Sequence, residues 1–250
     1  MRPISEQPLL SLSPLAKAFR YFHSPRISKL GWTKLLLSCG IVSSVLYIAI
    51  DLIASLRWYA GYSYLDQEFS ELYAVGSPVR DRMIPLNGVP YLLLVLAFAL
   101  GVWLSAGPKR AARATVAMLV GYAVLGFIGG VVTPMSTREA LAAGERTLSN
   151  SLHPPMTALM SLFVLLAIGF GARLVGKRFR WYSYGTIFTM IVFGVSTFPF
   201  VSRMEANQPT PWMGVLERVN IYGIMLWVAV LATCLWREEV PVGPDKRTGA

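Results

Sequence analysis

Charged residues and cysteines are scarce in this sequence. Of its 250 residues only 14% are charged and 54% are hydrophobic, which departs from the composition of soluble proteins. The 23 basic residues exceed the 13 acidic ones, but they flank apolar stretches and form no basic patch on a soluble domain, which argues against nucleic-acid binding. The two cysteines, Cys39 and Cys234, form no recognisable redox or metal-binding motif.

Established catalytic motifs are missing as well. The sequence has no H-E-x-x-H or G-x-S-x-G motif, no phosphate-binding loop and no histidine-rich cluster with metal-ligand spacing. Ser70 followed by Glu71 is not a nucleophile signature. The sequence therefore predicts no metal site, and it leaves open which cofactor, if any, the protein uses.

What the sequence does contain is six long apolar runs. Each has about 20 residues or more, the length that an α-helix needs to cross a hydrocarbon core of roughly 30 Å. The predicted fold is all-α, a polytopic six-transmembrane-helix bundle over residues 32–236. The predicted spans are residues 32–56, 86–106, 111–132, 154–175, 181–201 and 213–236.

Two segments flank this membrane domain. Residues 1–31 form a basic N-terminal segment, in which residues 9–22 have the pattern of an interfacial helix, with a disordered tail as an equal alternative. Residues 237–250 form a tail. Sixteen of the 23 Lys and Arg residues lie in these segments or in the second and fourth connections, and seven lie on the opposite side. The positive-inside rule therefore predicts that both termini are cytoplasmic.

The longer connections fall on the opposite, outer side, where recognition or chemistry is expected. In the first of them Leu65, Phe69, Leu72 and Tyr73 have the spacing of a short amphipathic helix. On an ideal helical wheel Glu71 lies about 140° from the apolar centre of this helix. The pattern thus predicts a solvated Glu71, and the alternative is a carboxylate that points over the mouth of the bundle.

Polar residues near the outer ends of the spans are the candidate site. Asp51 is an ionisable residue inside the first span, which is either functional or an interfacial carboxylate that is hydrated or paired with Arg57. His153 precedes Pro154 and Pro155, which favour the first turn of a helix, so the imidazole is expected at the outer mouth.

The last span begins with a second group of polar residues. Glu217 precedes Arg218, and Tyr222 follows one helical turn later on the same face as the arginine. A guanidinium in this position suits bidentate binding of a phosphate or carboxylate. The bland alternative is an ion pair with a neighbour or a side chain that snorkels to the interface.

Several of these segments together resemble a known family. They are YSYLDQEFSEL followed by GSP, a third span that ends in VVTP, His153 near the fourth span, and ERVNIYGIMLW in the last. They resemble the uncharacterised prokaryotic membrane family catalogued as domain of unknown function 998, over about residues 35–237. The resemblance implies a six-span bundle in a prokaryotic cytoplasmic membrane, distantly similar to eukaryotic Frag1- and DRAM-type proteins. It also implies that Glu71, His153 and Arg218 act as a group, and it implies no activity.

Three functions are compatible with these residues. The first is a binding or accessory protein whose outward-facing polar mouth holds a lipid headgroup or a membrane protein partner, with Arg218 as anion clamp. The second is an enzyme acting on a lipid or lipid-linked substrate, with His153 as general acid or base oriented by Glu71. The third, a small transporter, is disfavoured because no pair of broken helices is visible. The remaining candidate ligand-binding residues are Asp51, Ser70, Glu217 and Tyr222. The oligomeric state is not predicted.

Overall fold

The computed structural model describes residues 25–238, and it is helical with no strand in that range. The predicted interfacial helix at residues 9–22 and most of the predicted tail lie outside the described residues. Six continuous helical segments are long and apolar enough to cross a membrane, which confirms the predicted all-α six-span bundle. These segments are Leu30–Trp58, Arg80–Ala106, Arg110–Val132, Leu148–Gly171, Lys177–Glu205 and Met213–Glu238.

Several spans combine more than one type of helix. The first is α2 (Pro25–Ile53) continued by the π-helical turn η1 (Ala54–Trp58), and the second joins α3 (Arg80–Met83), the π-helical turn η3 (Ile84–Gly88) and α4 (Val89–Ala106). The third is α5 (Arg110–Phe127) with the π-helical turn η4 (Ile128–Val132). The others are α7 (Leu148–Gly171), α8 (Lys177–Glu205) and α9 (Met213–Glu238), and between the spans lie the 3₁₀-helix η2 (Phe69–Tyr73) and the short α6 (Arg138–Ala142).

Two spans begin six residues earlier than the sequence predicts, at Arg80 against residue 86 and at Leu148 against residue 154. The second begins at Arg80 because α3 and η3 run into α4 without a break. The fourth begins at Leu148, so Pro154 and Pro155 lie inside α7 and do not open it. Helix α7 can start earlier because Thr147 caps it, with the Thr147 hydroxyl accepting a hydrogen bond from the Asn150 N–H.

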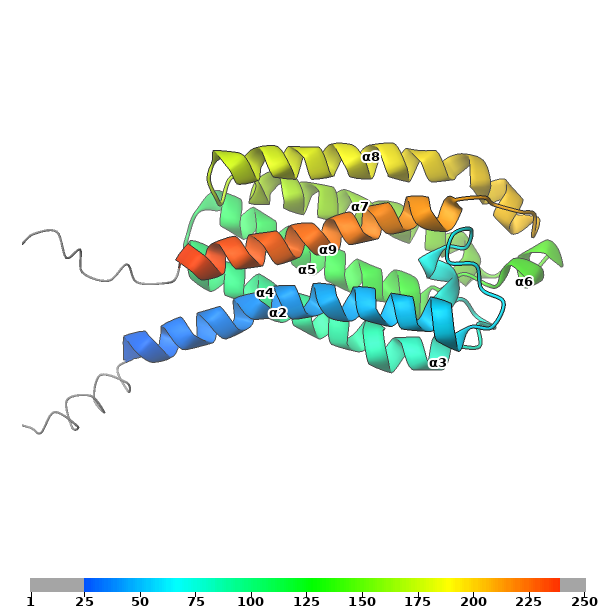
Figure 1. Cartoon of the computed structure of the whole chain (residues 1–250), viewed down its shortest axis with the longest axis horizontal. Helices are drawn as coiled ribbons and strands as arrows, with labels where there is room; N and C mark the ends of the chain where they lie inside the picture. The colour runs from blue at the N-terminus through cyan, green and yellow to red at the C-terminus, as the bar shows by residue number, and fades with distance from the viewer. Residues whose placement is uncertain (1–24, 239–250) are drawn as a thin grey trace, which may run out of the picture.

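The six spans form a ring in which each helix packs on the next in the order α2, α4, α5, α7, α8 and α9, and α9 closes the ring on α2. Residues 25 and 238 lie at one end of the bundle, and α3, α6 and the connection 59–79 lie at the other, which we call the capped end (Figure 1). All three π-helical turns are at the capped end (Figure 1).

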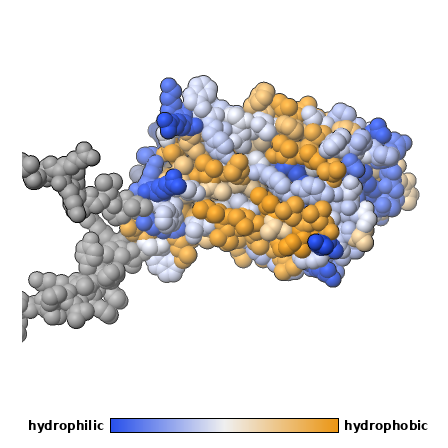
Figure 2. Space-filling model, in the orientation of Figure 1, coloured by the Kyte–Doolittle hydropathy of each residue, from blue (hydrophilic) through white to orange (hydrophobic). Residues whose placement is uncertain are grey.

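The surface has the distribution expected for a membrane protein. In the view of Figure 2, hydrophobic residues occupy the middle of the bundle and hydrophilic ones gather at the capped end. Tryptophan is typical of both membrane interfaces. Trp32, Trp181 and Trp236 are exposed at helix ends on one side, and Trp58 and Trp212 are exposed or partly exposed at the capped end.

Close helix contacts in the bundle depend on glycine. A Cβ atom at Gly101 of α4 would lie 2.8 Å from the backbone N of Leu37 and 2.9 Å from the carbonyl carbon of Leu36, both in α2. The two helices can pack at this distance because Gly101 has no side chain. At Gly185 of α8, in contrast, a Cβ atom would have no neighbouring atom within 4 Å.

Gly101→Ala is therefore expected to destabilise the protein by about 1–3 kcal/mol, the range for overpacking of a tight contact. The measurement is thermal unfolding of the purified protein in detergent micelles. Gly185→Ala is the matched control and should leave the melting temperature unchanged or raise it slightly. Equal melting temperatures for the two variants would contradict the close α2–α4 packing.

Candidate functional site

The capped end is built on the connection 59–79, which folds back over the bundle. Within it η2 begins with a capping box, in which the carboxylates of Glu68 and Glu71 each accept a hydrogen bond from the backbone N–H of the other. The predicted amphipathic helix is thus a short 3₁₀-helix that buries Phe69 and Leu72 but leaves Leu65 48% exposed. The prediction of a solvated Glu71 is wrong, because its side chain is buried.

Glu71 is buried because Arg138 neutralises it. Nε and Nη2 of Arg138, in α6, donate to the two Glu71 carboxylate oxygens at 2.7 and 2.6 Å. The Nη1 of Arg138 donates to the Thr210 hydroxyl at 2.8 Å. This Glu71–Arg138 clamp ties three connections at the capped end together. Burial and the nearby Glu71 carboxylate raise the pKa of Glu68 to about 7.

A second ion pair joins the first and last spans. Arg218 of α9 donates from Nε and Nη2 to the two carboxylate oxygens of Asp51 of α2, both at 2.9 Å. Asp51 is 0% exposed and Arg218 is 2% exposed. Asp51 therefore pairs with Arg218, and the alternative of an interfacial carboxylate paired with Arg57 is not what the structure shows.

The other donors of Arg218 also go to groups inside the protein. Nη2 donates to the Tyr62 hydroxyl at 2.8 Å, and Nη1 faces the carbonyl oxygens of Tyr64, Gln67 and Gly214 at 3.0, 2.9 and 3.3 Å. All five N–H bonds of a guanidinium are accounted for by these partners. An anionic ligand would have to displace one of these partners. Arg218 therefore holds protein groups together and has no free donor for a ligand.

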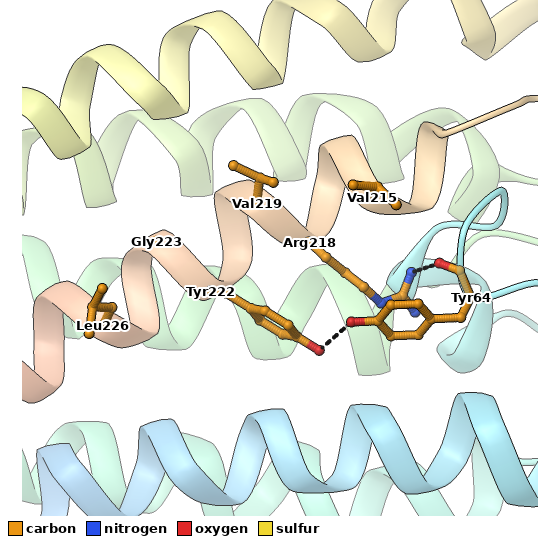
Figure 3. A pocket seen from close by; sticks show the side chains of 7 residues that line it. All are labelled: Tyr64, Val215, Arg218, Val219, Tyr222, Gly223 and Leu226. Carbon is orange, nitrogen blue, oxygen red and sulfur yellow. Dashed lines mark hydrogen bonds between the residues drawn. The ribbon is translucent and has the colours of Figure 1, made fainter.

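Two tyrosine hydroxyls extend this Asp51–Arg218 clamp toward the surface. The Tyr222 hydroxyl donates to Asp51 Oδ2 at 2.7 Å, and the hydroxyls of Tyr64 and Tyr222 lie 3.0 Å apart. The Arg218 guanidinium also stacks over the Tyr64 ring, 4.1 Å from its centroid. Figure 3 shows this ring lying against Arg218, with the two hydroxyl groups facing each other.

His153 makes different contacts. Its Nδ1 lies 3.1 Å from the Gly129 carbonyl oxygen and 3.0 Å from that of Thr133. Both partners are acceptors, so Nδ1 carries a proton and caps the carbonyls at the end of the third span. No hydrogen bond from His153 to Glu71 or Arg218 occurs among the described residues, whereas Gln67 links the latter two by donating to Glu71 and accepting from Arg218.

The two remaining candidates also bind inside the cap. Glu217 accepts a hydrogen bond from the Phe69 backbone N–H, and the Ser70 hydroxyl donates to Glu68 at 3.3 Å. Arg138 and Tyr64 are the residues that sequence reasoning missed. Arg138 lies in none of the segments that resemble the family, whereas Tyr64 lies in one of them, YSYLDQEFSEL, where no spacing or charge singles it out. Within residues 25–238 no group of three or more His, Cys, Asp or Glu is placed to hold a metal ion.

Beside the Asp51–Arg218 clamp an open groove of about 370 Å³ runs along α9 (Figure 3). It is lined by one face of that helix and by Tyr64, and we call it the α9 groove. Its lining residues are Tyr64, Val215, Arg218, Val219, Tyr222, Gly223 and Leu226. The surface of the groove is almost entirely apolar, and α9 lies between α2 and α8 on this side of the bundle (Figure 1).

A ring of six apolar spanning helices, closed at one end by internally paired connections, defines a polytopic helical membrane protein. The model of the family described as "Protein of unknown function (DUF998)" matches residues 41–234, and the chain belongs to this family. The family resemblance seen in the sequence is thereby confirmed. Comparisons with curated proteins and with solved structures give no match.

Removing one partner of the Asp51–Arg218 clamp is expected to destabilise the protein by about 3–5 kcal/mol, because the other charge stays buried without a counter-ion. The variants are Asp51→Asn and Arg218→Gln, and the measurement is thermal unfolding in detergent micelles. The double variant Asp51→Leu/Arg218→Met should recover part of this loss. Arg57→Gln, in the same span as Asp51 but exposed, is the control. A melting temperature of Arg218→Gln equal to that of the wild type would contradict the structural role.

Proposed function

We propose that the protein is a lipid-binding accessory protein of a membrane, and that its site is the α9 groove. The observation that carries the proposal is an open apolar groove at membrane depth on a spanning helix, next to a rigid polar network. The proposal keeps the binding role inferred from the sequence but moves the site. Arg218 is paired with Asp51, and Glu71 is paired with Arg138, so these side chains do not form an open mouth.

The dimensions of the groove fit one lipid chain. Its lining residues extend from Val215 to Leu226, which at 1.5 Å per residue is roughly 16 Å along α9. Half of a hydrocarbon core of roughly 30 Å is about the same length. The volume of about 370 Å³ lies at the lower end of the range for ligand pockets, which favours a single chain from one leaflet over a whole lipid.

The enzyme alternative has less support. An acid–base pair of His153 and Glu71 would need a hydrogen bond between them, directly or through one water. Glu71 instead accepts hydrogen bonds from Nε and Nη2 of Arg138, and the Nδ1 of His153 is bound to backbone carbonyls. Binding without chemistry is therefore the function that we propose.

Photolabelling tests this function. The purified protein is placed in vesicles of phosphatidylethanolamine and phosphatidylglycerol that carry a photoactivatable acyl chain, and the labelled residues are mapped by mass spectrometry. Labelling is expected to concentrate on residues 215–226. Val219→Trp, which fills the groove, should lower that labelling about threefold or more. Val195→Trp, the same change on the exposed face of α8, is the control. Equal labelling of the two variants would overturn the proposed site.

We further propose that the protein lies in a prokaryotic cytoplasmic membrane with both termini in the cytoplasm, as the distribution of basic residues favours. The α9 groove then opens to the outer leaflet. The test uses a variant in which Cys39 and Cys234 are replaced by alanine. In intact cells Ala143→Cys, in the exposed connection at the capped end, should react with a membrane-impermeant maleimide. Lys109→Cys, in the connection at the other end, should react only after permeabilisation. The opposite pattern would reverse the orientation.

A further inference from the structure

The α9 groove has a polar edge whose hydrogen-bonding character can be worked out from the geometry. This edge consists of the hydroxyls of Tyr64 and Tyr222 and of the Arg218 guanidinium behind them. Each group has a fixed number of protons to donate. Counting where those protons go shows what the edge offers to a ligand.

Arg218 has no N–H left for a ligand. Its Nε and Nη2 bind Asp51 and the Tyr62 hydroxyl, and its Nη1 binds backbone carbonyls. A phosphate or carboxylate in the groove would thus find no donor on this residue without breaking the Asp51–Arg218 clamp. Breaking a buried pair of this kind is costly.

The hydroxyl protons of Tyr64 and Tyr222 are also engaged, because the two hydroxyls donate in sequence toward Asp51. An ionised carboxylate only accepts hydrogen bonds, so the single hydroxyl proton of Tyr222 is donated to Asp51. The 3.0 Å contact between the two hydroxyls must then be donated by Tyr64, which has no second proton. What remains at the groove is acceptor capacity, most of it on the Tyr64 oxygen, which accepts no hydrogen bond from any described residue, whereas the Tyr222 oxygen already accepts one.

The depth of the polar edge in the membrane also favours a neutral ligand over an anion. Tyr222 lies nine residues, or roughly 13 Å, after the first residue of α9 at the capped end. That position is well inside the span, below the level at which the charged headgroup of a phospholipid sits. A small neutral donor on a hydrocarbon chain can occupy such a depth at a lower desolvation cost than an anion.

We propose that the α9 groove selects a neutral lipid chain with a hydroxyl group, which donates a hydrogen bond to the Tyr64 oxygen. The chemical class is a long-chain or isoprenoid alcohol, or a neutral glyceride with a free hydroxyl, and an anionic phospholipid is disfavoured. This inference rests on the proposed function, since it assigns the ligand class of the same groove.

The experiment compares three photoactivatable probes that share one alkyl chain and end in a hydroxyl, a methyl ether or a phosphate. Each is added to the full-length protein in phosphatidylcholine vesicles, and labelling of residues 215–226 is quantified. The hydroxyl probe is expected to label about two- to tenfold more than the ether, the range that one net hydrogen bond provides.

Tyr64→Phe should abolish the preference for the hydroxyl probe but leave labelling by the ether unchanged. The matched control is Tyr91→Phe, which removes a hydroxyl that also pairs with a second tyrosine at 3.0 Å, that of Tyr122, in the core and away from the groove. This control should keep the preference. Melting temperatures of both variants identify any general loss of folding, and a preference lost in both would overturn the role of Tyr64.

The outcomes separate the two proposals. Equal labelling by the hydroxyl and ether probes would overturn the ligand class while leaving the groove as a chain-binding site. Stronger labelling by the phosphate probe would overturn it in favour of an anion. If no probe labels residues 215–226, the proposed function itself fails.

Discussion

The buried ion pair between Asp51 and Arg218 constrains everything at the capped end. Two charges removed from water are tolerated only when each is paired and its remaining hydrogen-bonding groups are satisfied. Besides its two hydrogen bonds from Arg218, the carboxylate accepts one from the Tyr222 hydroxyl. The remaining N–H groups of the guanidinium donate to the Tyr62 hydroxyl and to the carbonyl oxygens of Tyr64, Gln67 and Gly214. The connection 59–79 must therefore follow a path that brings the carbonyls of Tyr64 and Gln67 to Arg218.

That path explains the second ion pair and the closed end of the bundle. With Gln67 held by Arg218, the turn that follows directs Glu71 inward, where Arg138 neutralises it. The two clamps join the first span, the last span and α6 through the connection 59–79. The polar residues that the sequence suggests as a binding site instead hold the connections of the capped end together. The accessible groove lies along α9.

The membrane spans follow from the sequence because hydropathy over 20 residues depends on local composition alone. The partners of the buried charges do not. Asp51 and Arg218 each stand out as polar residues near a span end, but they lie 167 positions apart, and their pairing depends on α9 closing the ring against α2. Glu71 was expected to be solvated because a helical wheel contains no information on Arg138, 67 positions away.

His153 illustrates the same limit in another form. Its place near the fourth span is evident from the sequence, whereas its role as a cap for the third span depends on the π-helical end of that span, whose carbonyls it binds. Such a turn leaves no clear trace in composition. The grouping of Glu71, His153 and Arg218 suggested by the family resemblance corresponds in part to a contact, since Gln67 bridges Glu71 and Arg218.

The order in which the chain is made gives the Asp51–Arg218 pair a further consequence. Asp51 belongs to the first span to leave the ribosome and Arg218 to the last, with 167 positions between them. At a synthesis rate of about 5–20 residues per second, Arg218 is made roughly 10–30 s after Asp51. During this interval the first span holds an acid that only protonation or water at the membrane surface can accommodate. The two ends of the ring are therefore joined through this ion pair only after α9 has been made.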